Sequence, residues 1–446
     1  MNAPLPVAFK TVLTKHFGSS VAQRVLEALE QPPNTSVRLN AQKPHQEFEN
    51  STPVPWCSQG KLLTERPSFI TDPFFHAGCY YVQDASSMIF DSILKSLPMP
   101  HHPLVLDLCA SPGGKTLVAL DAFENGLIVA NEIDGRRNNI LCENLLKWGR
   151  SNFVVTQATA EVFSPMNSKF DLVMVDAPCS GEGMFRKEEA ARLQWSESLI
   201  HRCSTIQGQL IERAVELVKP GGFLIYSTCT LNETENEMQV HALLNRGFEL
   251  VQDVFKPHAQ WLIEARFQGN TTGYYLLPGI SPGEGLFVSV LRKVSTDEVK
   301  TRSKVKLRAM RATPAESFEI AGKPYTGFTH IVSRGDYTLA LHDPGELFAE
   351  VSGLRSIKLP GRPLVQTKGK AEIPQHGAAM LPGATPEIEL TKNQALDFLR
   401  KHTIFAPENL RGWKLVGIET HALGWIKCMP GRTNNYYPTE MRIKHH

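Results

Sequence analysis

The chain has 446 residues, of which 42% are hydrophobic and 21% are charged, and its formal net charge is +2. This composition is typical of a soluble globular protein, and the length predicts two to four domains. The longest apolar runs, such as residues 104–108 and 172–175, are too short to cross a membrane, and Met1 is not followed by a basic region and an apolar core. We therefore expect no membrane span, no secretory signal and a cytoplasmic protein.

The eight cysteines are scattered along the chain and form no Cys-x-x-Cys pair. They predict neither a disulfide framework nor a zinc site, so we expect no bound metal ion. A cysteine taken alone is most often a small buried hydrophobic residue, so a chemical role must come from its position in the fold.

The charge is distributed unevenly. Residues 292–446 hold 24 Lys and Arg against 15 Asp and Glu, whereas residues 1–291 hold 23 against 30. Residues 292–311 include eight basic and two acidic side chains, and residues 355–370 include five basic and no acidic ones. A basic end beside an acidic body predicts that this end holds a polyanion by neutralising its phosphates. A solvated linker is the alternative interpretation of such a charge run.

Residues 5–31 are predicted to be helical, because Val21, Val25 and Leu29 recur at helical spacing before Pro32-Pro33. The region from 34 to 100 is rich in loops, with a predicted strand at 36–39 and a helix after 82–84. Regular alternation of strands and helices starts at residue 104. Five apolar runs predict strands, at 104–108, 127–132, 152–156, 171–176 and 222–227.

Helices are predicted between these strands, for example at 135–148 and 203–218, so the pattern is that of a parallel, doubly wound α/β sheet. A last helix is expected to begin near Asn232, which has capping-box spacing to Glu235. The segments 248–251 and 286–291 are expected to close the sheet as a hairpin-like pair.

Past residue 292 the pattern changes to a basic linker, short strands and turns, and then a separate small module. Residues 374–386, rich in Pro, Gly and Ala, predict a connection, and 395–400 predict a helix. The segment 432–438 interleaves Arg, Asn and Tyr, which can contact phosphates, base edges and base faces of single-stranded or loop RNA. Turn and core residues are the simpler interpretation of this segment taken alone.

A glycine turn, Asp-Leu-Cys-Ala-Ser-Pro-Gly-Gly-Lys-Thr at 107–116, follows the first strand of the sheet. Its end resembles a phosphate-binding loop, but the first glycine that such a loop needs falls on Cys109. The dinucleotide fingerprint is absent as well. Glu132, at the end of the next strand, can accept hydrogen bonds from ribose hydroxyls, although a helix cap is the alternative. Together the turn and this acid favour S-adenosylmethionine, which has a ribose but no phosphate.

Two cysteines lie at the ends of predicted strands: Cys179 follows Asp-Ala-Pro, and Cys229 follows Tyr-Ser-Thr. Ligands of an open α/β sheet bind outside the carboxyl ends of its strands, so both thiols are expected beside the cofactor. Cytosine C5 takes a methyl group only after a thiolate has added to C6, and a second thiol can assist the later release. The pair therefore favours RNA over DNA cytosine methylation. Asp176 is expected to meet the flat base, with a structural turn aspartate as the alternative.

The nucleophile needs a positive environment, because the pKa of a free cysteine is about 8.5. Cys229 precedes the helix expected near Asn232, and Lys115 or Arg186 can lend positive charge. The residues alone do not order the roles of the two thiols.

These motifs resemble the RNA cytosine-C5 methyltransferases of the Sun-domain (nucleolar-antigen) family, most closely the bacterial small-subunit rRNA methyltransferase F type. The resemblance rests on the glycine turn, on Asp-Ala-Pro-Cys-Ser-Gly-Glu-Gly-Met-Phe-Arg-Lys at 176–187 and on Tyr-Ser-Thr-Cys-Thr at 226–230. Residues 80–88 resemble the segment that leads into the family's catalytic domain, and 432–438 resemble its C-terminal RNA-binding (PUA-like) module. The resemblance therefore covers nearly the whole chain.

The resemblance implies a class I (Rossmann-like) enzyme, monomeric by family habit, that forms 5-methylcytosine in structured RNA with S-adenosylmethionine. Small-subunit rRNA is the expected substrate; a tRNA enzyme and a non-catalytic RNA-binding assembly factor are the alternatives. Cys229 would be the nucleophile, Cys179 the release cysteine, and Asp176 a contact near cofactor and base. The implied cofactor contacts are Cys109, Ala110, Ser111, Pro112, Gly113, Gly114, Lys115, Glu132 and Asp176.

One position departs from the family pattern. Where the family commonly has an aspartate near the adenine, this chain places Thr159, which can bond the adenine without carrying a charge. Four regions are expected: an N-terminal RNA-binding extension at 1–80, the catalytic domain at 81–293, a basic linker with a small β-rich domain at 294–370, and a PUA-like α+β module at 371–446.

Overall fold

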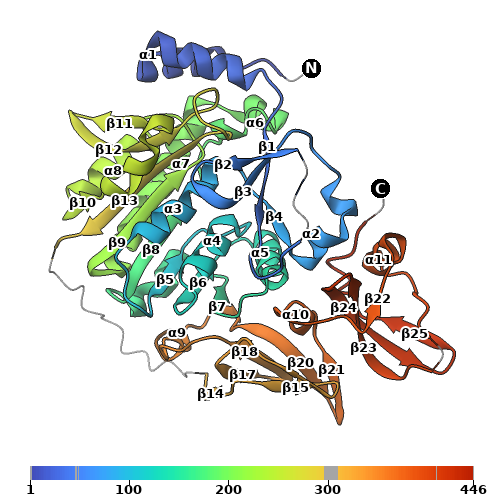
Figure 1. Ribbon diagram of the computed structural model, residues 1–446. Helices are drawn as coiled ribbons and strands as arrows, with labels where there is room; N and C mark the ends of the chain where they lie inside the picture. The colour runs from blue at the N-terminus through green and yellow to red at the C-terminus, as the bar shows by residue number, and fades with distance from the viewer. Residues whose placement is uncertain (1–2, 46–47, 49, 296–309, 408, 445–446) are drawn as a thin grey trace.

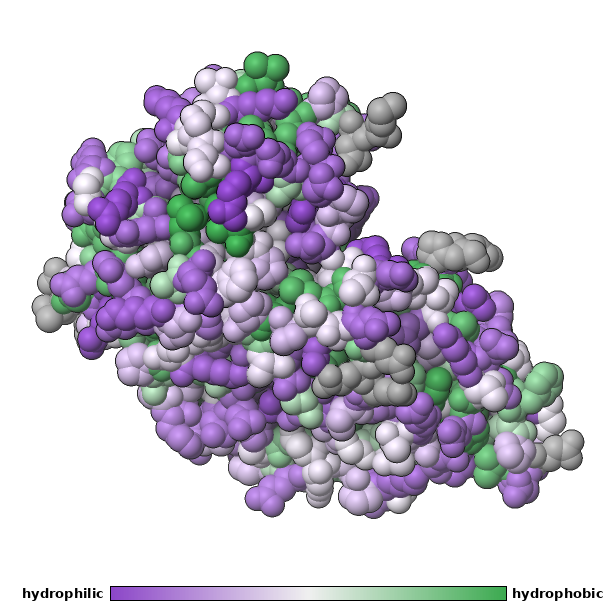
Figure 2. All heavy atoms as spheres, turned by 45° about the horizontal axis from the view of Figure 1, so that its top comes forward, coloured by the Kyte–Doolittle hydropathy of each residue, from purple (hydrophilic) through white to green (hydrophobic). Residues whose placement is uncertain are grey.

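The computed structural model describes residues 3–45, 48, 50–295, 310–407 and 409–444. Residues 296–309, most of the basic stretch predicted at 292–311, lie outside these ranges. Figure 1 shows an α/β body built by the first two thirds of the chain, with the β-rich C-terminal third, in orange and red, below it and to its right. On the face seen in Figure 2, hydrophilic side chains dominate and apolar ones form only small groups.

The N-terminal part combines a long helix with a small antiparallel sheet. Helix α1 spans Val7–Leu29, as its apolar spacing predicts, and bends at Gly18, whose φ is 77°. The sheet has the order β2-β3-β1-β4, and its strands are Thr35–Leu39 (β1), Ser51–Val54 (β2), Cys57–Leu63 (β3) and Tyr80–Val82 (β4). The predicted strand at 36–39 is confirmed. Strands β2 and β3 lie in a region predicted as loop, because Pro53 and Gly60 interrupt any apolar pattern there.

The predicted doubly wound parallel sheet is confirmed. Its parallel strands have the order β9-β8-β5-β6-β7, so the direction of strand addition reverses between β5 and β8. These strands are Leu104–Asp107 (β5), Leu127–Asn131 (β6), Phe153–Thr156 (β7), Phe170–Asp176 (β8) and Val218–Thr228 (β9). Such a reversal leaves a crevice outside the carboxyl ends of the strands, which is where ligands of these sheets bind.

Beyond β9 the sheet continues with antiparallel strands. They are Leu286–Lys293 (β13), Asn270–Leu276 (β12) and Ile263–Phe267 (β11), in that order. Phe248–Leu250 (β10) also pairs with β13, so the predicted pairing of 248–251 with 286–291 is confirmed. Strands β11 and β12 are absent from the sequence prediction because their charged and polar residues show no strand-like run.

Helices cover both faces of this sheet. Neighbouring residues of β5 point to opposite faces: Val105 belongs to one apolar cluster, and Leu104 and Leu106 belong to the other. The face of Val105 packs against Ile89–Ser96 (α3), Gly114–Ala122 (α4) and Gly135–Trp148 (α5). The opposite face packs against α1, Glu197–Leu217 (α7) and Glu237–Leu244 (α8).

The prediction that a helix begins near Asn232 is wrong, because α8 begins only at Glu237. Asn232 Oδ1 does accept a hydrogen bond from the Glu235 N–H at 3.0 Å, but this contact stabilises a turn before the helix. The other short helices before residue 294 are Pro73–Ala77 (α2), Glu189–Gln194 (α6), and the 3-10 turns Phe69–Thr71, Ser86–Met88, Ala160–Met166, Glu182–Met184 and Asp253–Trp261. No helix in the described ranges has both the length and the apolar character of a membrane span.

The C-terminal third forms two small β structures. The first sheet has the order β14-β17-β18-β20-β21, with strands Ala312–Pro314, His330–Arg334, Tyr337–Leu341, Arg362–Lys368 and Ala371–Pro374, beside the hairpin Phe318–Ile320 (β15) and Lys323–Tyr325 (β16). Because β21 pairs with β20, this sheet extends past residue 370, where the sequence places a domain boundary. The second sheet contains Ile388–Glu389 (β22), Gly412–Ile418 (β23), His421–Met429 (β24) and Arg432–Asn435 (β25).

Helices accompany these small sheets: Phe348–Val351 (α9), His376–Ala379 (α10) and Lys392–Leu399 (α11). The predicted helix at 395–400 thus matches α11, whereas α10 lies inside the predicted connection at 374–386. Strand Ile357–Leu359 (β19) leaves the C-terminal third and pairs with β7, so it becomes the edge strand of the central sheet.

The buried Arg362 docks the C-terminal third on helix α5 of the α/β body. Its side chain is 0% exposed and donates to the backbone carbonyls of Leu145, Leu146 and Arg150, at and just beyond the end of α5. The last carbonyls of a helix have no partner within the helix, so a cation that binds them stabilises this end.

We expect Arg362→Leu to lower the free energy of unfolding by about 2–4 kcal/mol, because several buried carbonyls lose their donor. Urea denaturation followed by circular dichroism measures this change. The exposed Arg355 is the matched control, and Arg355→Leu should leave the midpoint unchanged. Equal stability of the two variants would contradict the docking role.

Candidate active site

A crevice of about 420 Å³ opens where the carboxyl ends of β5, β8 and β9 meet. Its lining comes from the glycine turn, from the ends of β8 and β9, and from the segment after β4. Of the predicted site residues, Cys109, Ala110, Ser111, Pro112, Gly114, Lys115, Asp176 and Cys229 line it. The parallel sheet thus brings together segments that are more than a hundred residues apart in sequence.

The glycine turn connects β5 to α4. Gly113 has a φ of 114°, a left-handed conformation that favours glycine, and serves as the N-cap of α4 without a capping side chain. The first N–H groups of a helix have no partner within the helix, so they are available to a ligand in the crevice. Burial, followed by the charge of Asp107, raises the pKa of the Cys109 thiol, so this thiol stays neutral.

Lys115 and Asp176, which both line the crevice, form an ion pair with Nζ 2.8 Å from Oδ2. The second carboxylate oxygen, Oδ1, accepts a hydrogen bond from the Ser227 hydroxyl at 2.7 Å. Burial by itself would lower the pKa of Lys115, but the charge and hydrogen bond of Asp176 and the charge of Cys229 outweigh it and raise the pKa. Lys115 therefore stays a cation beside the crevice and can lend the expected positive charge.

The two cysteines are neighbours. Cys179 Sγ and Cys229 Sγ lie 3.1 Å apart, and both are free thiols. The hydrogen bond to Cys229, and then burial, raises the pKa of Cys179 well above its ordinary value. A proton on Cys179 can therefore be donated toward the Cys229 sulfur, an arrangement that stabilises negative charge on Cys229.

The buried Glu235 joins the two cysteine segments, and sequence reasoning missed this role. It is 0% exposed and accepts from the backbone N–H of Ser180 at 2.9 Å, and also from the Ser180 hydroxyl. The amides of Asn232 and Gln207 donate to it at 2.8 and 2.9 Å. The capping-box spacing drew attention to Glu235, but only for a helix end.

Glu182 makes a second link between the same segments. Its carboxylate accepts from the Leu231 N–H at 2.7 Å, from the Asn232 amide at 3.2 Å and from the Trp195 indole at 2.8 Å. Burial raises the pKa of Glu182. Within the quoted motif, nothing in the sequence distinguishes this structural carboxylate from a catalytic one.

Two of the expected sources of positive charge for Cys229 are not available in the structure. The helix N-terminus is displaced, because α8 begins at Glu237. Arg186 is committed to a buried ion pair, since its Nε and Nη2 donate to the two oxygens of Glu284 at 2.6 and 2.9 Å. Of the expected groups, Lys115 is the one that lines the crevice with Cys229.

Glu132 is 3% exposed and lies behind the crevice lining. Its Oε1 accepts from the Asp134 N–H at 2.9 Å, and its Oε2 lies 3.4 Å from Arg137 Nη2. The same Arg137 nitrogen donates to the Ser111 carbonyl at 3.0 Å, and Arg137 lines the crevice. Arg137, which sequence reasoning did not single out, therefore connects the glycine turn to Glu132.

Thr159 is exposed and lies outside the crevice lining. It precedes the turn Ala160–Met166, and its hydrogen bond to Glu161 lowers the pKa of that carboxyl. Gly113 shapes the turn without lining the crevice, and Cys179 likewise lies behind the lining, against Cys229.

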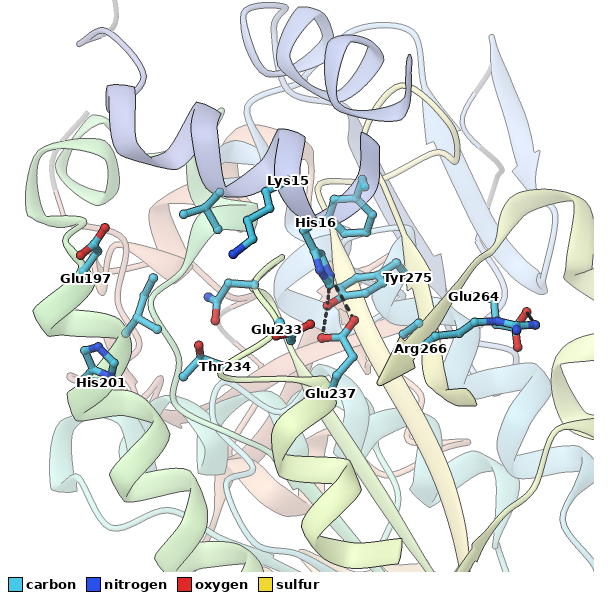
Figure 3. Close-up of a pocket in the computed structure, with 15 residues that line it drawn as sticks. Lys15, His16, Glu197, His201, Glu233, Thr234, Glu237, Glu264, Arg266 and Tyr275 are labelled. Atoms are coloured by element: carbon cyan, nitrogen blue, oxygen red, sulfur yellow. Dashed lines mark hydrogen bonds and ion pairs between the residues drawn. The ribbon is translucent and has the colours of Figure 1, made fainter. Parts of the chain in front are cut away.

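A larger cavity of about 470 Å³ lies between α1, α7 and the strands β11 and β12. Figure 3 shows His16 and Tyr275 directed at Glu237: His16 Nε2 is 3.1 Å from Oε1, and the Tyr275 hydroxyl donates to Oε2 at 2.9 Å. The described lining of this cavity contains no cysteine and no part of the glycine turn, so the smaller crevice is the better candidate for thiol chemistry. The described residues contain no cluster of three or more His, Cys, Asp or Glu side chains suited to a metal ion.

The predicted RNA contacts at 432–438 need a correction. The Asn435 amide donates to the carbonyls of Phe398 and His402 at 2.8 and 3.0 Å, and Tyr437 is 0% exposed. These two residues therefore stabilise the fold, whereas Arg432 and Tyr436 are exposed.

Three family models match the chain. Residues 95–292 match the model described as 16S rRNA methyltransferase RsmB/F. Residues 5–85 match the N-terminal domain of 16S rRNA methyltransferase RsmF, and residues 385–443 match the methyltransferase RsmF PUA domain.

Curated relatives and solved structures agree with these matches. Ribosomal RNA small subunit methyltransferase F from Erwinia tasmaniensis is 32% identical over 415 residues, covering 87% of this chain and 84% of the relative. The protein of that name from Escherichia coli O127:H6 is 30% identical, covering 98% of this chain and 96% of the relative. A methyltransferase homolog protein from Pyrococcus horikoshii is 29% identical with a TM-score of 0.55, covering 64% of this chain and 94% of that one. NSun6 from the same organism, solved with SFG, is 20% identical with a TM-score of 0.55 over 65% and 98% of the two chains, a likeness of fold alone.

Asp107, at the end of β5, gives the site a measurable pH dependence. Burial raises its pKa from 3.8 to about 7, although the Thr116 hydroxyl donates to it at 2.6 Å. Between these values the folded protein holds a proton that the unfolded chain has released, so the free energy of unfolding should fall as the pH rises from about 4 to 7.

In Asp107→Asn this fall in the free energy of unfolding should disappear, as measured by urea denaturation at a series of pH values. Asp336→Asn, at an exposed position, should keep the wild-type slope; a wild-type slope in Asp107→Asn would refute the assignment.

Proposed function

Because the chain belongs to the RsmB/F family of 16S rRNA methyltransferases, we propose that it methylates carbon 5 of a cytosine in small-subunit ribosomal RNA, with S-adenosylmethionine as the methyl donor. The observation that carries this proposal is the pair of sulfurs of Cys179 and Cys229, 3.1 Å apart beside a glycine turn. Two adjacent thiols match a reaction that adds a thiolate to the base and later expels it.

The crevice fits S-adenosylmethionine. Asp107 Oδ1 is buried and has no hydrogen-bond partner among the described residues, and α4 begins without a capping side chain. The turn residues Cys109 to Lys115 would surround the amino-acid end, and Glu132, with Arg137, would lie near the ribose. Thr159 stays a proposed adenine contact, with less support because it is outside the lining. S-adenosylmethionine bound there supplies an electrophilic methyl group.

Cys229 is the proposed nucleophile. Its thiolate forms a bond to C6 of the cytosine, and the electrons displaced from the ring double bond make C5 nucleophilic. Lys115 provides positive charge in the same crevice, and the Cys179 thiol provides a hydrogen bond to the sulfur. Asp176, oriented by Lys115 and Ser227, is proposed to contact the base at its ring nitrogen or exocyclic amine.

Cys179 is the proposed release residue. After methyl transfer the C5 proton must leave, and the electrons of the C5–H bond reform the ring double bond as the C6–S bond breaks. The largest cause of the raised Cys179 pKa is its hydrogen bond to Cys229. Once the Cys229 sulfur is bonded to carbon, this contribution is lost, so Cys179 can release its proton to solvent. Its thiolate then takes the C5 proton, and Cys229 leaves C6 as a thiolate.

We propose that the regions 1–80 and 371–446 bind the RNA and that residues 81–293 carry out catalysis. The basic linker and β-rich region of 294–370 connects residues 81–293 to the C-terminal region 371–446. In the last region Lys427 Nζ lies 5.2 Å from the Trp413 ring centroid, and Tyr436 packs edge-on against the same ring at 4.4 Å. Trp413 and Lys427 are partly exposed and Tyr436 is exposed, and accessible aromatic and cationic groups of this kind suit the bases and phosphates of RNA. We further propose a monomer located in the cytoplasm.

Cys229→Ala should abolish methyl transfer, and Cys179→Ala should accumulate a covalent protein–RNA adduct, because addition proceeds while release is blocked. Incubation with unmodified small-subunit rRNA and methyl-labelled S-adenosylmethionine measures the transfer, and denaturing electrophoresis detects the adduct. Cys203→Ala, on α7 and outside the crevice lining, should behave like the wild type. An adduct in Cys229→Ala and normal turnover in Cys179→Ala would show that the roles are reversed.

Bisulfite sequencing of RNA from cells with and without the gene tests the substrate. 5-Methylcytosine resists the conversion that bisulfite causes in cytosine, so one position in small-subunit rRNA should lose its protection in the deletion. Loss of protection in a tRNA instead would identify the tRNA alternative. Unchanged protection in every RNA would favour the non-catalytic assembly factor.

A further inference from the structure

Gln83 lines the crevice and has no part in the chemistry above. Gln83 is 5% exposed, and neither its Nε2 nor its Oε1 has a hydrogen-bond partner among the described residues. A buried amide without hydrogen bonds raises the free energy of the fold, so native structures nearly always provide a partner. The missing partner of Gln83 is therefore expected to be a ligand of the crevice.

The backbone of Gln83 is held in place by β1. Its N–H donates to the Ser36 carbonyl at 3.2 Å, and its own carbonyl accepts from the Ser36 hydroxyl at 2.5 Å. These bonds extend the pairing of β4 with β1 by one residue. The N-terminal sheet thus fixes the position from which this side chain reaches the catalytic domain.

The amide of Gln83 faces the start of α4. A Cβ atom added to Gly114, the first residue of α4, would lie 3.4 Å from Gln83 Nε2. Since the N-cap Gly113 has no capping side chain, the amide and the free N–H groups of α4 present donors to the same place. Such donors, together with the positive end of the helix, favour a carboxylate. Oε1 adds an acceptor, which suits an ammonium group.

We propose that Gln83 binds the amino-acid end of S-adenosylmethionine, donating from Nε2 to the α-carboxylate and accepting at Oε1 from the α-ammonium. This inference rests on the proposed function, because it assumes that S-adenosylmethionine occupies the crevice. It adds a binding residue from the segment after β4, outside the glycine turn and the ends of β8 and β9.

Two nucleosides separate this role from a general structural one. S-adenosylhomocysteine carries the amino-acid end, whereas 5′-methylthioadenosine keeps the adenosine and the sulfur but lacks it. In calorimetric titrations of the full chain, Gln83→Leu should weaken the binding of S-adenosylhomocysteine by roughly 10- to 100-fold, the loss expected for hydrogen bonds to charged groups. The binding of methylthioadenosine should be unchanged, and this also verifies that the variant is folded. Gln83→Glu, which places a carboxylate beside the ligand carboxylate, should show the same selective loss.

Gln42→Leu is the matched control, because Gln42 also has an unpartnered amide oxygen among the described residues but lies outside the crevice. It should leave both affinities unchanged. Unchanged binding of S-adenosylhomocysteine in Gln83→Leu, or an equal loss for both nucleosides, would overturn the proposal. Failure of the wild-type chain to bind either nucleoside would instead overturn the proposed function.

Discussion

The buried carboxylate of Glu235 determines where the two thiols stand. Five hydrogen bonds converge on it: two from Ser180 after Cys179, one each from Thr230 and Asn232 after Cys229, and one from Gln207 on α7. Strand pairing alone places β8 beside β9 but leaves the loops beyond the strands free to diverge. The sulfur–sulfur distance of 3.1 Å therefore depends on a side chain that needs no contact with substrate. Loss of a buried hydrogen-bonded carboxylate network would separate the thiols as well as destabilise the fold.

The N-terminal helix α1 is joined to the segment that follows Cys179, residues 180–192. Arg192 donates to the carbonyls of Ala3 at 2.8 Å, Leu29 at 2.7 Å and Phe185 at 2.6 Å, so it joins both ends of the α1 region to the segment after Cys179. Arg186, in that segment, also donates to the Ala28 carbonyl at 3.2 Å. Together with Gln83, these contacts make the N-terminal region part of the frame of the site. An RNA bound by that region would be held at a fixed distance from Cys229.

The sequence predicted the central sheet well because its strands are uniform apolar runs with helical segments between them. The glycine turn and the two cysteine segments were found for a related reason: each directly follows such a run. Local patterns could not reveal that Arg186 is neutralised by Glu284, or that Glu235 bonds across to Ser180, since these partners are 98 and 55 residues apart. Strands β11 and β12 were missed because antiparallel partners, not their own composition, hold them in the sheet. The same limitation applies to Asn435, whose amide donates to carbonyls within the fold, and to Tyr437, whose ring is buried against His376 and Phe398.

Strand β19 has a consequence for the order in which this protein can fold. It covers the outer edge of β7, yet it leaves the ribosome about two hundred residues after β7 does. During synthesis the nascent central sheet therefore presents a bare strand edge, which is a template for pairing with other chains. The catalytic domain can form most of its core early, but its sheet is completed only when the C-terminal third emerges. A fragment that ends at residue 293 would retain every cysteine of the crevice and still expose this edge, so it should self-associate rather than behave as an independent domain.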